Sequence, residues 1–185
     1  MATAKSLLQA QTWKKDDFFI STNPALFPLS TLAEVFDSSD FYWAKALPLQ
    51  DMKEMLENSL SFGLYEQREP NDPSQHPPAP KFIGLARCVT DFVTFCYLTD
   101  VWVDPSYQGR GLGGWLVSCV KKVLDGMPHL RRSMLFTASW EKSVPFYEKL
   151  MDMTLIESRK GEGLAIMESK GKGHPSYGCE GNGYN

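Results

Sequence analysis

Four closely spaced glycines, Gly109, Gly111, Gly113 and Gly114, are the residues whose type and spacing best indicate chemistry in this chain. They follow a β-branched and aromatic run that begins at Val101, and the segment after them has the pattern of a helix. At the start of a helix the backbone N–H groups lack intrahelical partners, and the helix dipole is positive there. The strand, the glycine turn and the helix together predict a cradle for a phosphate group.

The helix after the glycines is predicted from its apolar spacing. One face recurs at positions i, i+3, i+4 and i+7, which are occupied by Leu112, Trp115, Leu116, Cys119, Val120, Val123 and Leu124. Glycine suits the turn because a Cβ would keep the backbone from closing on an anion, and we expect positive φ at some of these positions. A P-loop would need Gly-Lys-Ser/Thr where this chain has Gly-Gly-Trp, and a dinucleotide-binding fold spaces its glycines differently. A tight turn without a ligand would account for one or two glycines.

Two motifs give the chain a resemblance to a known family. Gln108, Gly111 and Gly113 fit the signature Gln/Arg-x-x-Gly-x-Gly/Ala. The segment Pro145–Leu150 fits a Phe/Leu-Tyr-Glu-Lys-Leu helix and follows a strand-like run at Ser133–Ala138. Both motifs are those of the GNAT superfamily, the GCN5-related N-acetyltransferases, and the chain resembles a small single-domain member over roughly residues 16–168. The resemblance implies acetyl-coenzyme A (acetyl-CoA) as the cofactor.

The resemblance also implies which residues bind that cofactor. The glycine loop would hold the pyrophosphate, and the strand before it would run along the pantetheine arm. The N–H of Val101 or a near neighbour would polarise the thioester carbonyl. The implied cofactor-binding residues are Val101, Trp102, Val103, Gln108, Gly109, Arg110, Gly111, Leu112, Gly113, Gly114, Ser139 and Tyr147.

By the same resemblance, Tyr147 is the general acid that protonates the departing thiolate of coenzyme A. A phenol with a pKa of about 10 can do this in a dry site. The alternative is a half-buried aromatic residue on an amphipathic helix. The chain departs from the family after Leu150, where Met151-Asp152-Met153 replaces the usual Gly-Phe, so the helix end needs another cap. Many members have an asparagine near Ser139, and we expect Ser139 to be both the N-cap and a hydrogen-bond partner.

The amine that receives the acetyl group must first lose a proton, because an alkylammonium has no lone pair. Asp100 is the one carboxylate within the predicted central strand, and a buried charge there is costly unless it is paired or functional. We expect Asp100 either to accept this proton or to pair with Arg87 on the neighbouring strand. Tyr97, Glu34 and Asp91 are weaker candidates for the base.

Composition agrees with one compact enzyme domain. The chain has 185 residues, of which 43% are hydrophobic, and its formal net charge of −3 gives no reason to expect nucleic-acid binding. No apolar run approaches the ~20 residues that span a bilayer, and the start lacks a secretory signal. We therefore expect no membrane partner and a cytoplasmic location, with the nucleus left open. The cysteines and histidines lack metal-ligand spacing, so we expect no metal site; the cysteines are Cys88, Cys96, Cys119 and Cys179.

The predicted elements follow the family's order βααβββαβαββ, which has seven strands, and the sequence assigns residues to six of them. Strands are expected at Asp17–Ser21, Phe62–Glu66, Phe82–Val89, Val93–Val103, Ser133–Ala138 and Leu164–Met167, and helices at Leu29–Phe36 and Leu49–Leu60 as well as after the glycines and at Pro145–Leu150. The fold class is mixed α/β (α+β). In the family, helices flank both faces of a twisted sheet of about six to seven strands, and the fourth and fifth strands splay apart. We expect a single domain over residues 1–168 with a proline-rich loop at 68–81, and a flexible tail at 169–185.

The acceptor is the least specified part of the sequence. Aromatic residues are enriched in the amino-terminal third, which forms the acceptor groove in the family, but each can equally be a core residue. We expect acetyl transfer from acetyl-CoA to a primary amine of a small molecule or amino acid, by direct attack in a ternary complex. The alternatives are a protein or peptide N-acetyltransferase and a non-catalytic module that binds an acyl-CoA. The resemblance leaves a homodimer open.

Overall fold

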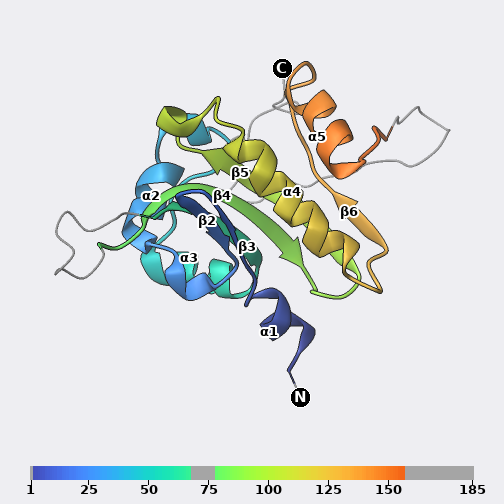
Figure 1. Ribbon diagram of the computed structural model, residues 1–185, viewed down its shortest axis with the longest axis horizontal. Helices are drawn as coiled ribbons and strands as arrows, with labels where there is room; N and C mark the ends of the chain where they lie inside the picture. The colour runs from blue at the N-terminus through green and yellow to red at the C-terminus, as the bar shows by residue number, and fades with distance from the viewer. Residues whose placement is uncertain (1, 68–77, 157–185) are drawn as a thin grey trace, which may run out of the picture.

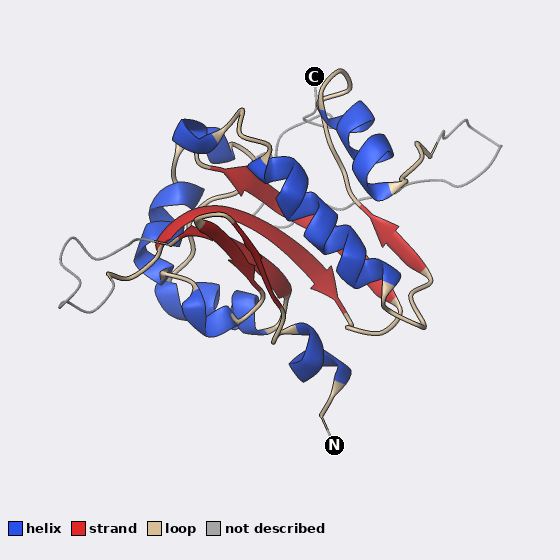
Figure 2. Cartoon of the chain, viewed as in Figure 1, coloured by secondary structure: helices blue, strands red, loops and turns tan. Residues whose placement is uncertain are grey.

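The computed structural model of the chain describes residues 2–67 and 78–156. These residues form one six-stranded sheet with helices on both faces (Figures 1 and 2). The helices are α1 (Ala4–Leu8), α2 (Leu29–Phe36), α3 (Leu49–Glu57), α4 (Leu112–Asp125) and α5 (Ser143–Met151), with short 3-10 helices η1 (Pro24–Leu26), η2 (Ser39–Phe41) and η3 (Pro105–Tyr107). The strands are β1 (Thr12–Lys15), β2 (Phe18–Ser21), β3 (Leu60–Glu66), β4 (Lys81–Thr90), β5 (Phe95–Val103) and β6 (Arg132–Met134).

The strands lie in the sheet in the order in which they occur in the chain. Each pair of neighbours from β1 to β5 is antiparallel, whereas β5 and β6 are parallel. The predicted hairpin between β4 and β5 is confirmed, and its turn is held by Asp91. The Asp91 carboxylate accepts hydrogen bonds from the Thr94 hydroxyl and from the N–H groups of Val93, Thr94 and Phe95, and these bonds hold its pKa well below the usual range.

Two hydrophobic cores lie on opposite faces of the sheet. Leu60, Phe62 and Leu64 alternate along β3 and pack with the buried face of α4, as the period of a strand requires. Tyr65, the next residue of β3, points to the opposite face and belongs to the second core with Leu32 of α2 and residues of α3. This arrangement confirms the expected mixed sheet with helices on both faces.

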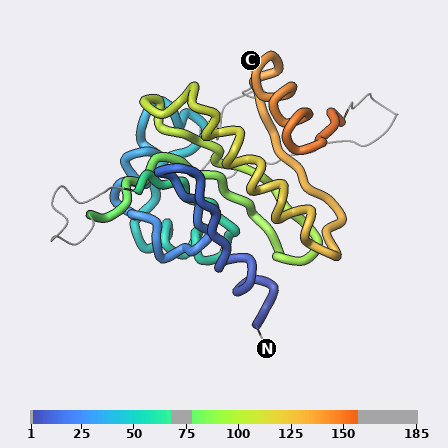
Figure 3. Tube along the Cα trace, viewed as in Figure 1, coloured from blue at the N-terminus to red at the C-terminus, as the bar shows by residue number. Residues whose placement is uncertain are grey.

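The expected splay of the fourth and fifth predicted strands is confirmed. These strands are β5 and β6 in the structure, because β1 was not predicted. Their parallel pairing covers only Phe95–Tyr97 opposite Arg132–Met134. Strand β6 ends there, and the chain leads on to α5, while β5 continues to Val103 (Figure 3). Among the strands that the structure describes, none pairs with the second half of β5 on this side, so its backbone is available to a ligand.

A β-bulge interrupts β5 in the same half. Leu85 pairs with Trp102 and Arg87 with Thr99, so two residues of β5, Asp100 and Val101, lie opposite the single residue between Leu85 and Arg87. Asp100 adopts a left-handed backbone conformation with φ of 51°. The bulge therefore sits where β5 has already parted from β6.

Some predicted boundaries were wrong. The predicted helix at Leu49–Leu60 ends at Glu57, because Leu60 already begins β3. The predicted strand at Ser133–Ala138 is shorter, since β6 loses its partner where β5 diverges. Strand β1 and helix α1 were not predicted. The strand expected at Leu164–Met167, the tail at 169–185 and most of the proline-rich loop lie outside the described residues. Within residues 2–67 and 78–156, every helix is too short or too polar to span a bilayer.

Candidate active site

The glycine turn leads from the end of β5 into α4. Gly109 and Gly111 have φ of 77° and 74°, which confirms the positive φ expected in this turn. Gly111 is the N-cap of α4 and makes no side-chain cap hydrogen bond. A Cβ built on Gly109 or Gly111 would have no atom within 4 Å, so the turn opens on free space. The first N–H groups of α4 have no intrahelical partner and stand at the positive end of the helix dipole. This geometry suits an anion.

Two side chains of the turn hold it in place. The Gln108 side-chain amide donates to the carbonyl oxygen of Val103, at 3.0 Å, and ties the turn to the end of β5. Leu112 is only 3% exposed and anchors the first turn of α4 in the core. The structure therefore uses these two predicted cofactor-binding side chains to shape the turn. The Gln108 N–H also donates to the carbonyl oxygen of Pro105, so the N–H groups left for a ligand are those at the start of α4.

Alternate residues at the end of β5 point to opposite faces of the sheet. Val101 and Val103 pack against the core that contains α4, and a Cβ on Gly113 would stand 3.7 Å from Val103 Cγ2. Trp102 belongs to the other core, where its ring stacks on Phe82 with centroids 6.2 Å apart. The two valines thus lie beside the glycine turn, and the Trp102 side chain lies on the opposite face.

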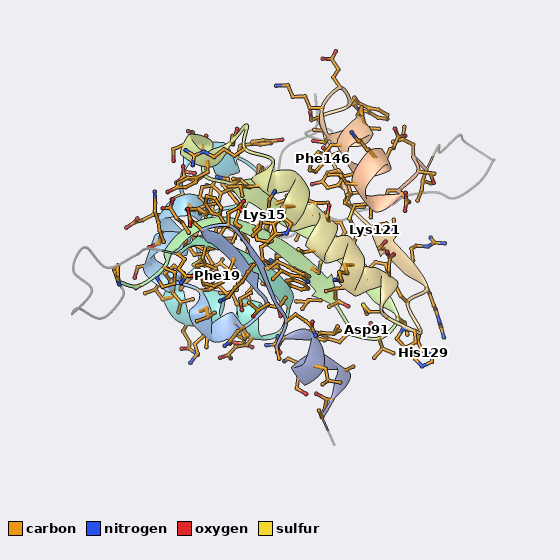
Figure 4. All side chains as sticks on the ribbon, viewed as in Figure 1. Lys15, Phe19, Asp91, Lys121, His129 and Phe146 are labelled. Atoms are coloured by element: carbon orange, nitrogen blue, oxygen red, sulfur yellow. The ribbon has the colours of Figure 1, made fainter. Side chains whose placement is uncertain are left out.

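Helix α5 brings Tyr147 to the side of α4. A Cβ on Gly114 would stand 3.7 Å from Leu150 Cδ1, so the glycine at the start of α4 lets α5 approach closely. The Tyr147 ring packs edge-on against Phe146, with centroids 5.1 Å apart, and Figure 4 shows Phe146 on α5. Burial raises the pKa of the Tyr147 hydroxyl to about 12. Tyr147 therefore keeps its proton at neutral pH, as a proton donor must.

The prediction that Ser139 caps α5 was wrong. The N-cap is Lys142, because a turn at Trp140–Lys142 separates Ser139 from the helix. The backbone carbonyl of Ser139, and not its hydroxyl, accepts the hydrogen bond from the N–H of Ser143 at 3.0 Å. The other end of α5 is closed by Asp152, which takes the left-handed conformation (φ 51°) and whose carboxylate lies 3.1 Å from Lys121 Nζ. Asp152 is the alternative cap that the sequence required.

Asp100 is the centre of a buried polar network at the bulge. Its carboxylate accepts hydrogen bonds from Arg87 Nε at 2.6 Å, from the Trp43 indole N–H at 3.2 Å and from the Thr99 hydroxyl at 3.2 Å. Arg87 also donates to the Ser59 hydroxyl at 3.2 Å. The predicted pairing of Asp100 with Arg87 is therefore present. The contacts join β5, β4 and the segment after η2, and the local sequence pattern gave no signal for Trp43.

A pocket of about 480 Å³ opens on the face of the sheet that carries α2. Trp102, Phe82 and Val35 give it apolar walls, Glu34, Asp40 and Asp104 give it acidic groups, and Lys81 also lines it. The Trp102 indole N–H is buried without a hydrogen-bond partner among the described residues. Such a group favours a ligand with an acceptor atom, because an unpaired buried donor is costly.

Among the weaker candidates for the base, only Glu34 lines this pocket. Asp91 lies at the far end of the β4–β5 hairpin, near His129 and the C-terminal end of α4 (Figure 4). The half-buried Tyr97 ring packs against Phe136, with centroids 5.4 Å apart, in the segment where β5 still pairs with β6.

The family model of the Acetyltransferase (GNAT) family matches residues 32–153, which include the glycine turn, Asp100 and Tyr147. The chain belongs to this family. As a GNAT enzyme it is an N-acetyltransferase, and the resemblance stated from its motifs is confirmed.

Individual relatives agree with the family. A Gibberella zeae protein named as an acetyltransferase is 34% identical over 177 residues, which are 91% of this chain and 99% of that protein. The crystal structure of a GNAT protein from Xanthomonas campestris pv. campestris has a TM-score of 0.61 and 26% identity, and covers 84% of this chain and 94% of its own. The glucosamine 6-phosphate N-acetyltransferase of Trypanosoma brucei brucei is 38% identical over 81 residues, 38% of this chain and 42% of that enzyme.

The cysteines of this acetyltransferase are small core residues where the structure describes them. Cys88, Cys96 and Cys119 are buried and free. Burial raises the pKa of the Cys119 thiol to about 11, and the contact with Cys96 together with burial raises that of Cys88. Thiols that stay protonated are poor nucleophiles. Cys179 lies outside the described residues. Among the described residues, no group of three His, Cys, Asp or Glu side chains could hold a metal ion.

Proposed function

We propose that this GNAT enzyme transfers the acetyl group of acetyl-CoA to a primary amine of a small molecule or amino acid, by direct attack in a ternary complex. The observation that carries the proposal is the open turn at Gly109 and Gly111, which presents the free N–H groups at the start of α4. The match to the GNAT family over residues 32–153, which include this turn, supports its assignment as the cofactor cradle.

The residues around the turn fit coenzyme A. The N–H groups of Gly113 and Gly114 would hold the pyrophosphate, and the edge of β5 at Val101 and Val103 that lacks a partner strand among the described residues would run along the pantetheine. When bound, acetyl-CoA supplies an acetyl group activated as a thioester. The bulge leaves Val101 without a Cα partner on β4, and its N–H would stabilise negative charge that develops on the carbonyl oxygen.

Tyr147 would donate its proton to the sulfur of the departing thiolate. Its raised pKa keeps the hydroxyl protonated across the neutral range, and the close packing of α5 on α4 would hold the ring at the side of the cradle. General acid catalysis of this kind is typically worth about 10²–10⁴ in rate. The family motif and the observed burial together support this role.

We propose that the acceptor amine approaches from the pocket over Trp102. The acidic side chains of Glu34 and Asp40 line this pocket and would attract a cationic amine, and its volume of about 480 Å³ suits a small molecule. The similarity to a glucosamine 6-phosphate N-acetyltransferase also favours a small acceptor. The amine's proton would pass to water in this open pocket.

For Asp100 we propose the anchoring role and not that of the base. Its carboxylate already accepts three hydrogen bonds, and its side chain is only 4% exposed. A carboxylate committed in this way fixes the bulge and the segment that contains Trp43. Taking up a proton would cost it the pairing with Arg87.

A thiol-release assay with acetyl-CoA tests the proposed acceptor class. The panel contains glucosamine 6-phosphate, small diamines, free amino acids and short peptides with a free N-terminus or lysine. We expect turnover with small amines, and a rise in KM for them in Glu34→Gln and Asp40→Asn, with the acetyl-CoA Kd unchanged. Glu57→Gln, on the exposed C-terminal end of α3, is the control. Turnover with peptides alone would replace the small-molecule assignment, and cofactor binding without any turnover would favour a binding module.

A further inference from the structure

Tyr107, immediately before the glycine turn, carries two cations on its ring. The Arg110 guanidinium lies 5.0 Å from the ring centroid and Lys81 Nζ lies 4.7 Å from it. Both distances are within the range of a cation–π interaction. The two cations come from different elements, because Lys81 begins β4 and Arg110 belongs to the turn. Tyr107 is therefore the point at which they meet.

The Tyr107 ring is fixed to the sheet. It is only 8% exposed, and Phe18 packs edge-on against it with centroids 6.3 Å apart. Its hydroxyl donates to Glu66 Oε2 at 2.7 Å and accepts from Lys81 Nζ at 3.2 Å. Glu66 and Lys81 are paired residues of β3 and β4, so the hydroxyl is held by two neighbouring strands. The ring is a rigid platform.

The cations on this platform keep most of their hydrogen-bonding capacity. Within the described part of the chain, neither Lys81 nor Arg110 is within 4.0 Å of a carboxylate oxygen, although other cations there form such pairs. Arg110 is exposed, and its guanidinium offers five donors in a planar fork that matches phosphate oxygens. An oriented guanidinium with free donors, next to the open turn, is suited to an anion.

We propose that Tyr107 is a positioning residue that presents Arg110, together with Lys81, to a phosphate group of coenzyme A. The inference rests on the proposed function and adds to it a charged half of the phosphate site, built on an aromatic platform. The backbone N–H groups of the turn would take one phosphate, and this cluster would take a further one, either in the pyrophosphate or at the 3′ position of the ribose. Stacking reduces the rotamer freedom that Arg110 loses on binding.

Coupling between Tyr107 and Arg110 in cofactor binding separates this role from simple packing. We would titrate acetyl-CoA by calorimetry into the wild type, Tyr107→Phe, Tyr107→Leu, Arg110→Met and the double variant Tyr107→Leu/Arg110→Met. We expect Arg110→Met to weaken binding about tenfold or more, since hydrogen bonds to charged groups are strong. Tyr107→Leu should weaken it about fivefold and Tyr107→Phe less than twofold, because the ring and not the hydroxyl orients Arg110.

The double variant gives the deciding result. It should bind only about twofold more weakly than Arg110→Met alone, and not about fivefold, because without Arg110 the ring positions Lys81 alone. The proposal would be overturned if the fold-increase in Kd of the double variant equalled the product of those of the single variants. An unchanged Kd in Tyr107→Leu would also overturn it. Lys5→Met, which removes a cation 5.6 Å from the Phe92 ring, is the matched control and should leave the Kd unchanged. If Tyr107→Leu fails to fold, Lys81→Met takes its place, and an unchanged Kd there overturns the shared platform.

The same titrations with acetyl-dephospho-CoA identify the phosphate. An equal loss for both ligands in Arg110→Met assigns the cluster to the pyrophosphate, and a loss for acetyl-CoA alone assigns it to the 3′-phosphate. Both results support the proposal. If the wild type binds neither ligand, the proposed function itself fails, and this inference fails with it; binding by the wild type without coupling refutes only the role of Tyr107.

Discussion

Removing one member of the Asp100–Arg87 pair should strongly destabilise the protein. The pair is close and shielded, with Arg87 Nε 2.6 Å from Asp100 Oδ2 and side chains that are 15% and 4% exposed. Asp100→Asn removes the charge, keeps the shape and tolerates the left-handed backbone at this position, where φ is 51°. Arg87→Met is the complementary change. The double variant removes both charges.

The expected magnitude follows from the burial of the pair. Two unit charges about 4 Å apart attract by about 4 kcal/mol at an effective dielectric constant of about 20. Removing one partner of a buried pair typically costs about 3–5 kcal/mol, because the other charge stays buried without compensation. Arg87 keeps its hydrogen bond to Ser59, so we expect the lower end, about 3 kcal/mol, for each single variant. The double variant should lose about 3 kcal/mol or less in total.

Urea unfolding at pH 7 of the four proteins measures this coupling. Domains have free energies of unfolding of about 5–15 kcal/mol, so each variant should still fold. Single losses under about 1 kcal/mol, or a double loss equal to the sum of the single losses, would refute the argument that the pair is a buried unit. The folded double variant also tests the role of Asp100. A rate within about tenfold of the wild type agrees with anchoring, whereas a loss of about 10²–10⁴ would make Asp100 the base.

Three further perturbations test other parts of the account. Tyr147→Phe should lower kcat about 10²-fold in the thiol-release assay and leave the acetyl-CoA Kd unchanged, since the ring still packs against Phe146; an unchanged kcat would remove Tyr147 from the mechanism. The free energy of unfolding should fall as pH rises above 10, because the unfolded state ionises its tyrosines near pH 10 while burial raises the pKa of Tyr147 to about 12. Between pH 8 and pH 11, Tyr147 should lower the free energy of unfolding by about 1 kcal/mol. Tyr147→Phe should lack this contribution, and an identical pH dependence in that variant would contradict the argument. Asp152→Gly should raise Tm by about 1–2 °C in thermal unfolding, because glycine takes φ of 51° without strain and the lost ion pair to Lys121 is exposed; a lower Tm would show that the ion pair matters more.

The parts of the fold that the sequence predicted are those set by local patterns. The apolar spacing from Leu29 to Phe36 gave α2 with its observed bounds, and the glycines gave the turn and the start of α4. Strand β1 was missed because it is an exposed edge strand in which Lys14 and Lys15 are exposed and only Trp13 is half-buried. An edge strand of this kind lacks the alternation that identifies a strand.

The parts of the site that were missed depend on contacts between distant residues. Trp43 donates to Asp100 across 57 positions of the chain, and Tyr107 donates to Glu66 across 41. Neither contact leaves a local signal, because each is created by the way strands and loops are brought together. Ser139 failed as a cap for a related reason, since a turn not evident in the sequence displaces the start of α5.

Binding of acetyl-CoA at the glycine turn is the claim on which the rest depends. Calorimetry should show micromolar binding by the wild type and none by Gly111→Asp/Gly113→Asp, which places side chains and negative charge in the open turn. Gly126→Asp adds one negative charge at the other end of α4 and should bind like the wild type. Equal binding by the wild type and the turn variant would place the cofactor elsewhere, and no binding by the wild type would contradict the proposed function.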